Sequence, residues 1–210
     1  MTVTAKKLGE FFDTARDAMR QSSACDRSGT AMDLEQGIDW AVTTARKAHD
    51  AGNKLMFIGN GGSAGIAGHA ANDFSKNGDL RALAFNDGAV LTCLANDYGY
   101  EHVFEKQIEW HARAGDMLIA ISSSGRSANI LRAVDAARKI GCQVLTLSGF
   151  KPDNPLRALG DVNIHVPLEE YVFVEITHQM MIDSVLAFSL GWATADDRNP
   201  GALALRAANQ

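Results

Sequence analysis

The stretch KLMFIGNGGS, residues 54–63, holds the pattern that decides the fold. The apolar run 54–59 predicts a short buried strand, and the glycines after it predict a tight turn. A helix is expected to begin near Ser63. A buried strand that leads through a glycine-rich turn into a helix is the first half of a βαβ unit.

The same alternation continues along the chain. Four further apolar runs predict strands at 82–85, 116–122, 143–148 and 162–166. Helical periodicity lies between and after them, at 89–112 with a break near Gly99, in ANILRAVDAARKI before Gly141, and at about 170–191. Strands that alternate with helices predict a mainly parallel sheet covered on both faces. We therefore expect an α/β fold with a doubly wound, five-stranded parallel sheet.

Two amphipathic helices are predicted at 5–22 and 32–51, before any strand signal. The chain contains no long Pro/Ser/Gly linker and no internal repeat. We expect a single domain, 1–210, in which 1–52 is a helical N-terminal extension, 53–191 is the α/β core and 192–210 is a loosely ordered tail.

Composition excludes several classes of protein. The 210 residues are 46% hydrophobic and 21% charged, which is typical of a globular domain. A net charge of −5 without a Lys/Arg block argues against nucleic-acid binding and against an anionic membrane surface. The sequence has no signal-peptide core and no apolar run of the ~18 residues that a membrane span needs. Scattered Cys25, Cys93 and Cys142 are interpreted as reduced packing thiols, which favours a cytoplasmic location.

Two unusual loops follow the first and third predicted strands. In doubly wound sheets, ligands bind beyond the carboxyl ends of the strands, where the strand order reverses. GNGGS (59–63) follows a strand and opens a helix, so its amides and the helix N-terminus can attract an anion. Asn60, Gly61 and Ser63 are the expected contacts. The loop matches neither a dinucleotide fingerprint nor a Walker loop.

The second loop, SSSGRSAN (122–129), is rich in hydroxyl groups. Ser122, Ser123, Ser124 and Ser127 place four of them within six positions, before a helix N-terminus. One serine is accounted for by ordinary N-capping, but four are not. This density of donors predicts a site for a phosphate monoester.

Acidic and imidazole side chains occur on two of the predicted helices. His69 and Asp73 are four residues apart and share a helix face. On the last helix, Glu175 and Asp183 are separated by about 80° around the axis, so both could face one cleft. His178 lies about 140° from Asp183 and is harder to bring into the same site.

GNGGS, ISSSGRSAN and NDYGYEHVF (96–104), on an α/β frame with two leading helices, resemble the sugar isomerase (SIS) domain. Over about residues 30–190 the chain is most similar to the phosphoheptose isomerase family. The resemblance implies a flavodoxin-like SIS fold, a homotetramer and conversion of sedoheptulose 7-phosphate to an aldose phosphate for heptose and surface polysaccharide synthesis. It also implies a phosphorylated sugar as partner and a divalent metal, zinc in many members.

The resemblance assigns roles to individual positions. The serine loop would hold the phosphate, and Asp87 in FNDGA and Glu175 would contact substrate. His69, Asp73, Glu175 and Asp183 occupy the family's metal-ligand positions, with Asp73 and Asp183 at the proton-transfer pair. The family carries Glu, Gln and His where this chain has Asp73, Glu175 and Asp183. One histidine with three carboxylates could still hold zinc or manganese, and the alternative is surface salt bridges.

These departures bear on catalysis. An aspartate at position 73 ends about 1 Å short of a glutamate, and a misplacement of that size can cost on the order of 100-fold in rate. Asp183 lacks the near-neutral pKa of an imidazole unless burial raises its pKa. Two alternatives follow. One is a non-catalytic SIS module that binds a sugar phosphate or a protein, as a tetrameric relative binds the bacterial replication initiator. The other is an isomerase of a different ketose phosphate.

Overall fold

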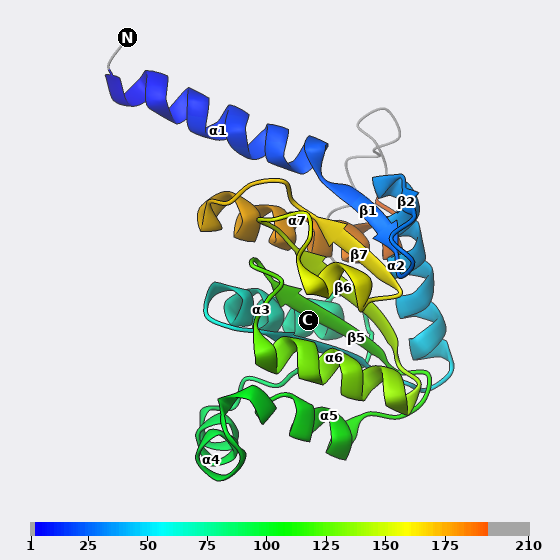
Figure 1. Ribbon diagram of the computed structural model, residues 1–210. Helices are drawn as coiled ribbons and strands as arrows, with labels where there is room; N and C mark the ends of the chain where they lie inside the picture. The colour runs from blue at the N-terminus through cyan, green and yellow to red at the C-terminus, as the bar shows by residue number, and fades with distance from the viewer. Residues whose placement is uncertain (1–2, 193–210) are drawn as a thin grey trace.

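The computed structural model describes residues 3–192, in which helices cover both faces of one seven-stranded sheet (Figure 1). The strands are β1 (Ser23–Asp26), β2 (Ala31–Met32), β3 (Leu55–Gly59), β4 (Ala82–Ala84), β5 (Met117–Ser122), β6 (Gln143–Ser148) and β7 (Val162–His165). The helices are α1 (Val3–Gln21), α2 (Leu34–Asp50), α3 (Gly62–Lys76), α4 (Gly88–Tyr98), α5 (Glu105–His111), α6 (Ala128–Ile140) and α7 (Tyr171–Ser189), with short 3-10 turns at Tyr100–His102 and Pro155–Ala158.

The five predicted strands form the parallel part of the sheet, which confirms the doubly wound α/β prediction. Their spatial order is β7-β6-β5-β3-β4. The parallel part of the sheet therefore begins in its middle with β3. The chain then adds β4 on one side and β5, β6 and β7 on the other. The order reverses between β3 and β5, which pair from Leu55↔Met117 to Gly59↔Ile121. The glycine and serine loops both leave the sheet at this switch point.

Residues 1–52 were predicted as a helical extension; its two helices are present as α1 and α2, but the prediction missed two short strands between them. Between α1 and α2 the chain forms β1 and β2, and β1 pairs antiparallel with β7 from Ser23↔His165 to Asp26↔Val162. α2 also belongs to the main core, since Ile38, Ala41 and Ala45 are buried in it. The N-terminal segment thus completes the sheet and covers one of its faces.

The sheet is covered by different helices on its two faces. Alternation along β3 shows the division: Leu55 and Phe57 pack toward α2, α3 and α7, whereas Met56 and Ile58 pack toward α4, α5 and α6. Every residue of β3 and β5 is buried. Continuous apolar runs, rather than alternating ones, are the sequence pattern of strands covered on both faces.

Helix α1 is less enclosed than the others. In Figure 1 it extends away from the α/β body, and its contacts run mainly to α7. Phe11 contacts Phe173 of α7, with ring centroids 4.9 Å apart and ring planes inclined by 43°. Leu8 and Phe12 nevertheless remain exposed, at 50% and 61%. An apolar face of α1 is therefore left uncovered in the single chain.

Three predictions about the whole chain can be set against the structure. The cysteines are free; Cys25 and Cys142 are buried as expected, but Cys93 is exposed. None of the described helices has the length and apolarity that crossing a bilayer requires. The predicted tail falls almost entirely at 193–210, outside the described residues.

A buried polar layer lies where β6 and β7 meet α7. His178 is fully buried, and its Nε2 lies 3.1 Å from the carbonyl oxygen of Ser148. Burial lowers the pKa of His178 to about 4, from an ordinary value of 6.5. Burial also lowers the pKa of His165, which lies at the end of β7. Both histidines thus belong to the fold as neutral, packed side chains.

We predict that the free energy of unfolding falls as the pH falls from about 6.5 to about 4. The unfolded chain takes up a proton on His178 in this window that the folded protein excludes, because the folded pKa is the lower one. Protonation of His178 in the unfolded chain should lower the free energy of unfolding by about 3 kcal/mol across this window. The free energy of unfolding, measured by denaturant melts across this range, should fall less steeply with pH for His178→Gln than for wild type. His165 should account for part of the pH dependence that remains. Exposed His111→Gln is the control, and equal slopes for His178→Gln and wild type would contradict the assignment.

Candidate functional site

The glycine loop makes a sharp turn from β3 into α3. Gly61 has φ = 53°, in a region that side chains rarely adopt, and no side chain caps the start of α3. Gly59 is required by close packing, because a Cβ there would lie 2.7 Å from the Cβ of Ser63. Ser63 is buried against this turn, at 4% exposure. Its position therefore also has a packing role beside the predicted contact with phosphate.

The serine loop makes the equivalent turn from β5 into α6. Ser127 is the N-cap residue of α6, yet its side chain makes no capping hydrogen bond. Instead its Oγ lies 3.3 Å from the Oγ of Ser122, and Ser124 Oγ accepts a hydrogen bond from the amide of Arg126 at 3.3 Å. Buried Ser123 Oγ has no hydrogen-bond partner among the described residues. Hydroxyls thus gather at an uncapped helix N-terminus, an arrangement that suits an anion.

A reciprocal amide pair joins the two loops. Asn60 donates to Oδ1 of Asn129 at 2.9 Å, and Asn129 donates to Oδ1 of Asn60 at 2.8 Å. The hydroxyl of Tyr100 donates to the same Asn60 oxygen at 3.1 Å. The side chain of Asn60 thus holds the loops together, and its contact with phosphate stays a prediction. Sequence reasoning missed Asn129 and Tyr100, although both lie within the quoted motifs.

Glu175 lies at the N-terminus of α3. A Cβ placed on Gly62 would be 2.5 Å from both carboxylate oxygens of Glu175, so the carboxylate packs directly on the Gly62 backbone. A negative charge at this end of a helix is favoured by the helix dipole. The side chain thus occupies the space over α3 where an anion would approach, which leaves the serine loop as the freer of the two helix starts.

The other three acid–base candidates lie further along α3 and α7, close enough for the charges of His69 and Asp73 to act on Asp183. His69 Nε2 lies 3.2 Å from Oδ2 of Asp73, and Asp183 Oδ1 accepts from Gln179 Nε2 at 2.7 Å. Burial raises the pKa of Asp183, the nearby Asp73 charge raises it further, and Gln179 and His69 lower it. For Asp183 to act in place of an imidazole, the sequence analysis required that burial raise its pKa. In the structure burial does raise the pKa of Asp183.

The predicted metal ligands do not come together. Among residues 3–192, no group of three or more His, Cys, Asp and Glu side chains could hold a metal ion. Glu175 and Asp183 point to similar sides of α7, but eight residues correspond to about 12 Å of helix rise. Glu175 therefore lies level with Gly62, and Asp183 with His69 and Asp73. As these residues lie, they do not fit a four-ligand site, so the divalent metal stays a prediction.

Asp87 has a local structural role. Its carboxylate caps α4 by accepting from the amide of Val90 at 2.9 Å, and its side chain is exposed. The neighbouring Asn86 donates to the carbonyl oxygen of Ala64 in α3 at 2.8 Å. Asp87 therefore stands at the loop edge of the sheet, and its contact with substrate stays a prediction.

Comparison with known proteins agrees with this geometry. Residues 22–149 match the family model described as the SIS domain. The phosphoheptose isomerase of Citrifermentans bemidjiense is 35% identical over 156 residues, covering 71% of this chain and 81% of that protein. That of Aliarcobacter butzleri is 36% identical over 167 residues, covering 73% and 86%.

A solved structure of phosphoheptose isomerase from Neisseria gonorrhoeae superposes with a TM-score of 0.75 at 29% identity, covering 90% of this chain and 99% of that one. Family model, sequence relatives and fold agree with one another. The chain therefore belongs to the SIS-domain proteins and, among them, to the phosphoheptose isomerase family.

Proposed function

We propose that this protein is a sugar-phosphate isomerase that converts sedoheptulose 7-phosphate to an aldoheptose 7-phosphate for heptose synthesis. The observation that carries the proposal is the joining of two uncapped helix N-termini at the switch point by the Asn60–Asn129 pair. Family membership supports the same reaction. The serine loop would bind the phosphate, since Glu175 covers the start of α3.

The reaction moves protons between neighbouring atoms of the sugar. A base removes a proton from C1 of the ketose while an acid protonates the carbonyl oxygen on C2, which gives an enediol. The O1 hydroxyl then loses its proton and C2 gains one, which gives the aldose. Asp73 is proposed as the base, because its carboxylate stands at the family's proton-transfer position and is oriented by His69 Nε2 at 3.2 Å. Asp183 is proposed as the acid, because burial raises its pKa and favours the protonated form.

A homotetramer is proposed with this function. Large apolar side chains remain exposed along α1 and α7; they are Leu8, Phe11, Phe12, Tyr171, Val172, Ile176, Met180 and Phe188. Apolar patches on this scale mark surfaces that another subunit covers. The divalent metal of the resemblance is also kept as a proposal, and no step above depends on it.

We predict that Asp73→Asn abolishes formation of aldose phosphate from sedoheptulose 7-phosphate, because an amide cannot accept the C1 proton. Asp73→Glu should raise kcat by up to about 100-fold, because it moves the carboxylate about 1 Å toward the substrate. Exposed Asp135→Asn on α6 is the control. The assay is run with metal-stripped protein, then with zinc and with manganese.

Wild-type protein that binds the sugar phosphate in calorimetry but turns it over with neither metal would overturn the isomerase proposal. That outcome would favour a non-catalytic SIS module. The shortened carboxylate of Asp73 and the separated Glu175 are the observations that make this second function worth testing.

We predict that Gln179→Ala shifts the pH profile of kcat upward by roughly half a unit to one unit. The hydrogen bond from Gln179 lowers the pKa of Asp183, so its loss raises that pKa. An acid acts while protonated, so the falling limb of the profile moves to higher pH. Gln143→Ala removes an exposed glutamine as the control. A limb that stays in place, or moves to lower pH, contradicts the role of Asp183.

We predict that Phe12→Asp lowers the molar mass measured by light scattering to that of a dimer or monomer. A charge in the uncovered face of α1 would be buried in the assembly without a partner. Lys7→Asp, on the same helix, should leave the mass at four chains. A wild-type mass of one chain would show that this face does not join subunits.

A further inference from the structure

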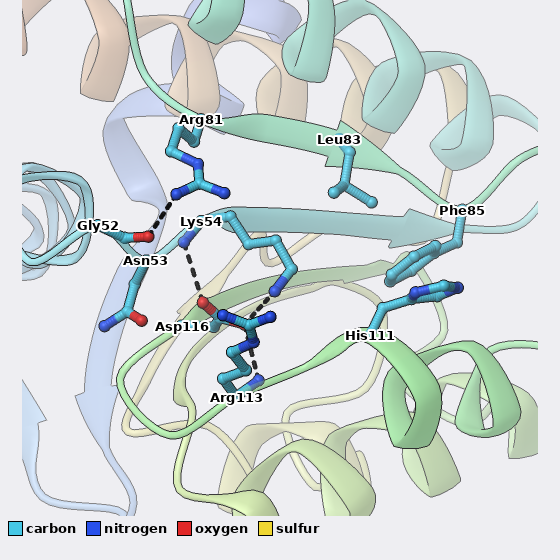
Figure 2. A pocket seen from close by; sticks show the side chains of 9 residues that line it. All are labelled: Gly52, Asn53, Lys54, Arg81, Leu83, Phe85, His111, Arg113 and Asp116. Atoms are coloured by element: carbon cyan, nitrogen blue, oxygen red, sulfur yellow. Dashed lines mark hydrogen bonds and ion pairs between the residues drawn. The ribbon is translucent and has the colours of Figure 1, made fainter.

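A cavity of about 370 Å³ lies at the opposite edge of the sheet from the serine and glycine loops. Its lining includes residues that precede β3, β4 and β5, namely Lys54, Arg81 and Asp116 (Figure 2). From these strand starts the lining runs along β4 to Phe85, just after that strand, and it includes no residue of the serine or glycine loops. The cavity is therefore separate from the proposed phosphate site. Its volume lies within the range of roughly 300–1,000 Å³ that is typical of ligand pockets.

The cavity is positively charged although the protein is acidic. Lys54, Arg81 and Arg113 line it together with a single carboxylate, Asp116. The cavity thus carries an excess of positive charge in a chain whose net charge is −5. Such a concentration of one sign in a concave site attracts ligands of the opposite sign.

A structural role accounts for only one of these cations. Asp116 is 1% exposed and accepts hydrogen bonds from the Lys54 amide at 3.0 Å, from the Lys54 ammonium at 2.5 Å and from the Arg113 amide at 2.8 Å. This network ties the start of β3 to the start of β5. It uses the charge of Lys54 but not the guanidinium of Arg113.

Both arginine side chains keep donors available. Arg81 donates one hydrogen bond, from Nη1 to the carbonyl oxygen of Gly52 at 2.6 Å. Within residues 3–192, neither Arg81 nor Arg113 forms an ion pair with a carboxylate. A guanidinium presents up to five N–H groups in a planar fork that matches phosphate oxygens. Arg81 is held in place by Gly52 with further donors free, and Arg113 is free to turn toward a ligand.

The wall beyond Leu83 is aromatic. Phe85 and His111 stack with ring centroids 5.9 Å apart and planes inclined by 22°. Figure 2 shows the two rings side by side, across the cavity from Arg81 and Asn53. Phe85 is buried whereas His111 is exposed, so the imidazole is the ring of the pair that a further flat ring could reach. Offset stacking on an aromatic face suits such a ring.

We propose that this cavity is a second binding site, which takes an organic phosphate bearing a flat ring, as in a nucleoside diphosphate. Arg81 and Arg113 hold the phosphates, and the ring stacks on His111. The proposal is independent of the isomerase activity, because no residue of the site belongs to the serine or glycine loops.

The test is calorimetric titration of the full chain with ADP, pyrophosphate and adenosine as probes. ADP should bind with an affinity that falls as salt rises, and more tightly than pyrophosphate or adenosine. Arg113→Ala should weaken ADP binding by about tenfold or more, as expected for the loss of a charge-assisted contact. Arg132→Ala, which removes an exposed arginine on α6, is the matched control.

Two further variants separate the parts of the site. His111→Ala should weaken ADP but leave pyrophosphate unchanged, and Ser122→Ala should leave ADP binding intact. Within residues 3–192 the Arg113 side chain makes no hydrogen bond, so its truncation should leave thermal unfolding unchanged. Absence of ADP binding by the wild type, equal effects of Arg113→Ala and Arg132→Ala, or loss of ADP binding in Ser122→Ala would each overturn the proposal.

Discussion

The buried carboxylate of Asp116 holds the two central strands at their starting edge. It receives both the amide and the ammonium of Lys54 together with the amide of Arg113. A buried charge is tolerated when its hydrogen bonds are satisfied in this way, and its loss is costly because unpaired donors then remain. At the other edge the same two strands are tied by the Asn60–Asn129 amide pair. β3 and β5 are thus fixed at both ends, and the loops that they carry inherit that rigidity.

Polar groups at the two edges of the sheet are arranged for different purposes. At the carboxyl edge, hydroxyls and backbone amides gather at helix starts, where the attraction for an anion is partial and directional. At the amino edge, full charges of Lys54, Arg81 and Arg113 line one cavity. The first arrangement suits a substrate that must be positioned and released. The second suits a ligand that is held mainly by charge.

Prediction from the sequence succeeded wherever a long pattern existed. The five parallel strands were predictable because each is a short run rich in apolar residues between helical stretches, and α6 because its apolar stripe ends at Gly141. β1 was missed because four residues with Ala24 and Cys25 inside give no period to detect. Its strand character comes from pairing with β7, which is distant in the sequence.

The candidate site was predictable residue by residue but not as an assembly. His69 and Asp73 do meet, because a separation of four residues on one helix is enough to place them. Glu175 and Asp183 were grouped by their angle around α7, which ignores the distance along its axis. The bridging role of Asn60 depends on a loop contributed by another strand, and so does not follow from its own motif. The direction of the Asp183 pKa required knowledge of its burial.

The contact between Glu175 and Gly62 links two parts of the chain that are far apart in sequence. Since Glu175 fills the space that any side chain at position 62 would need, the two positions cannot vary independently. A shorter residue on α7 would open room over the glycine turn and remove a negative charge from the start of α3. The size and charge of one residue on the last helix thus set how closely an anionic group can approach the first loop. Relatives with different substrates could differ there while keeping the whole glycine motif unchanged.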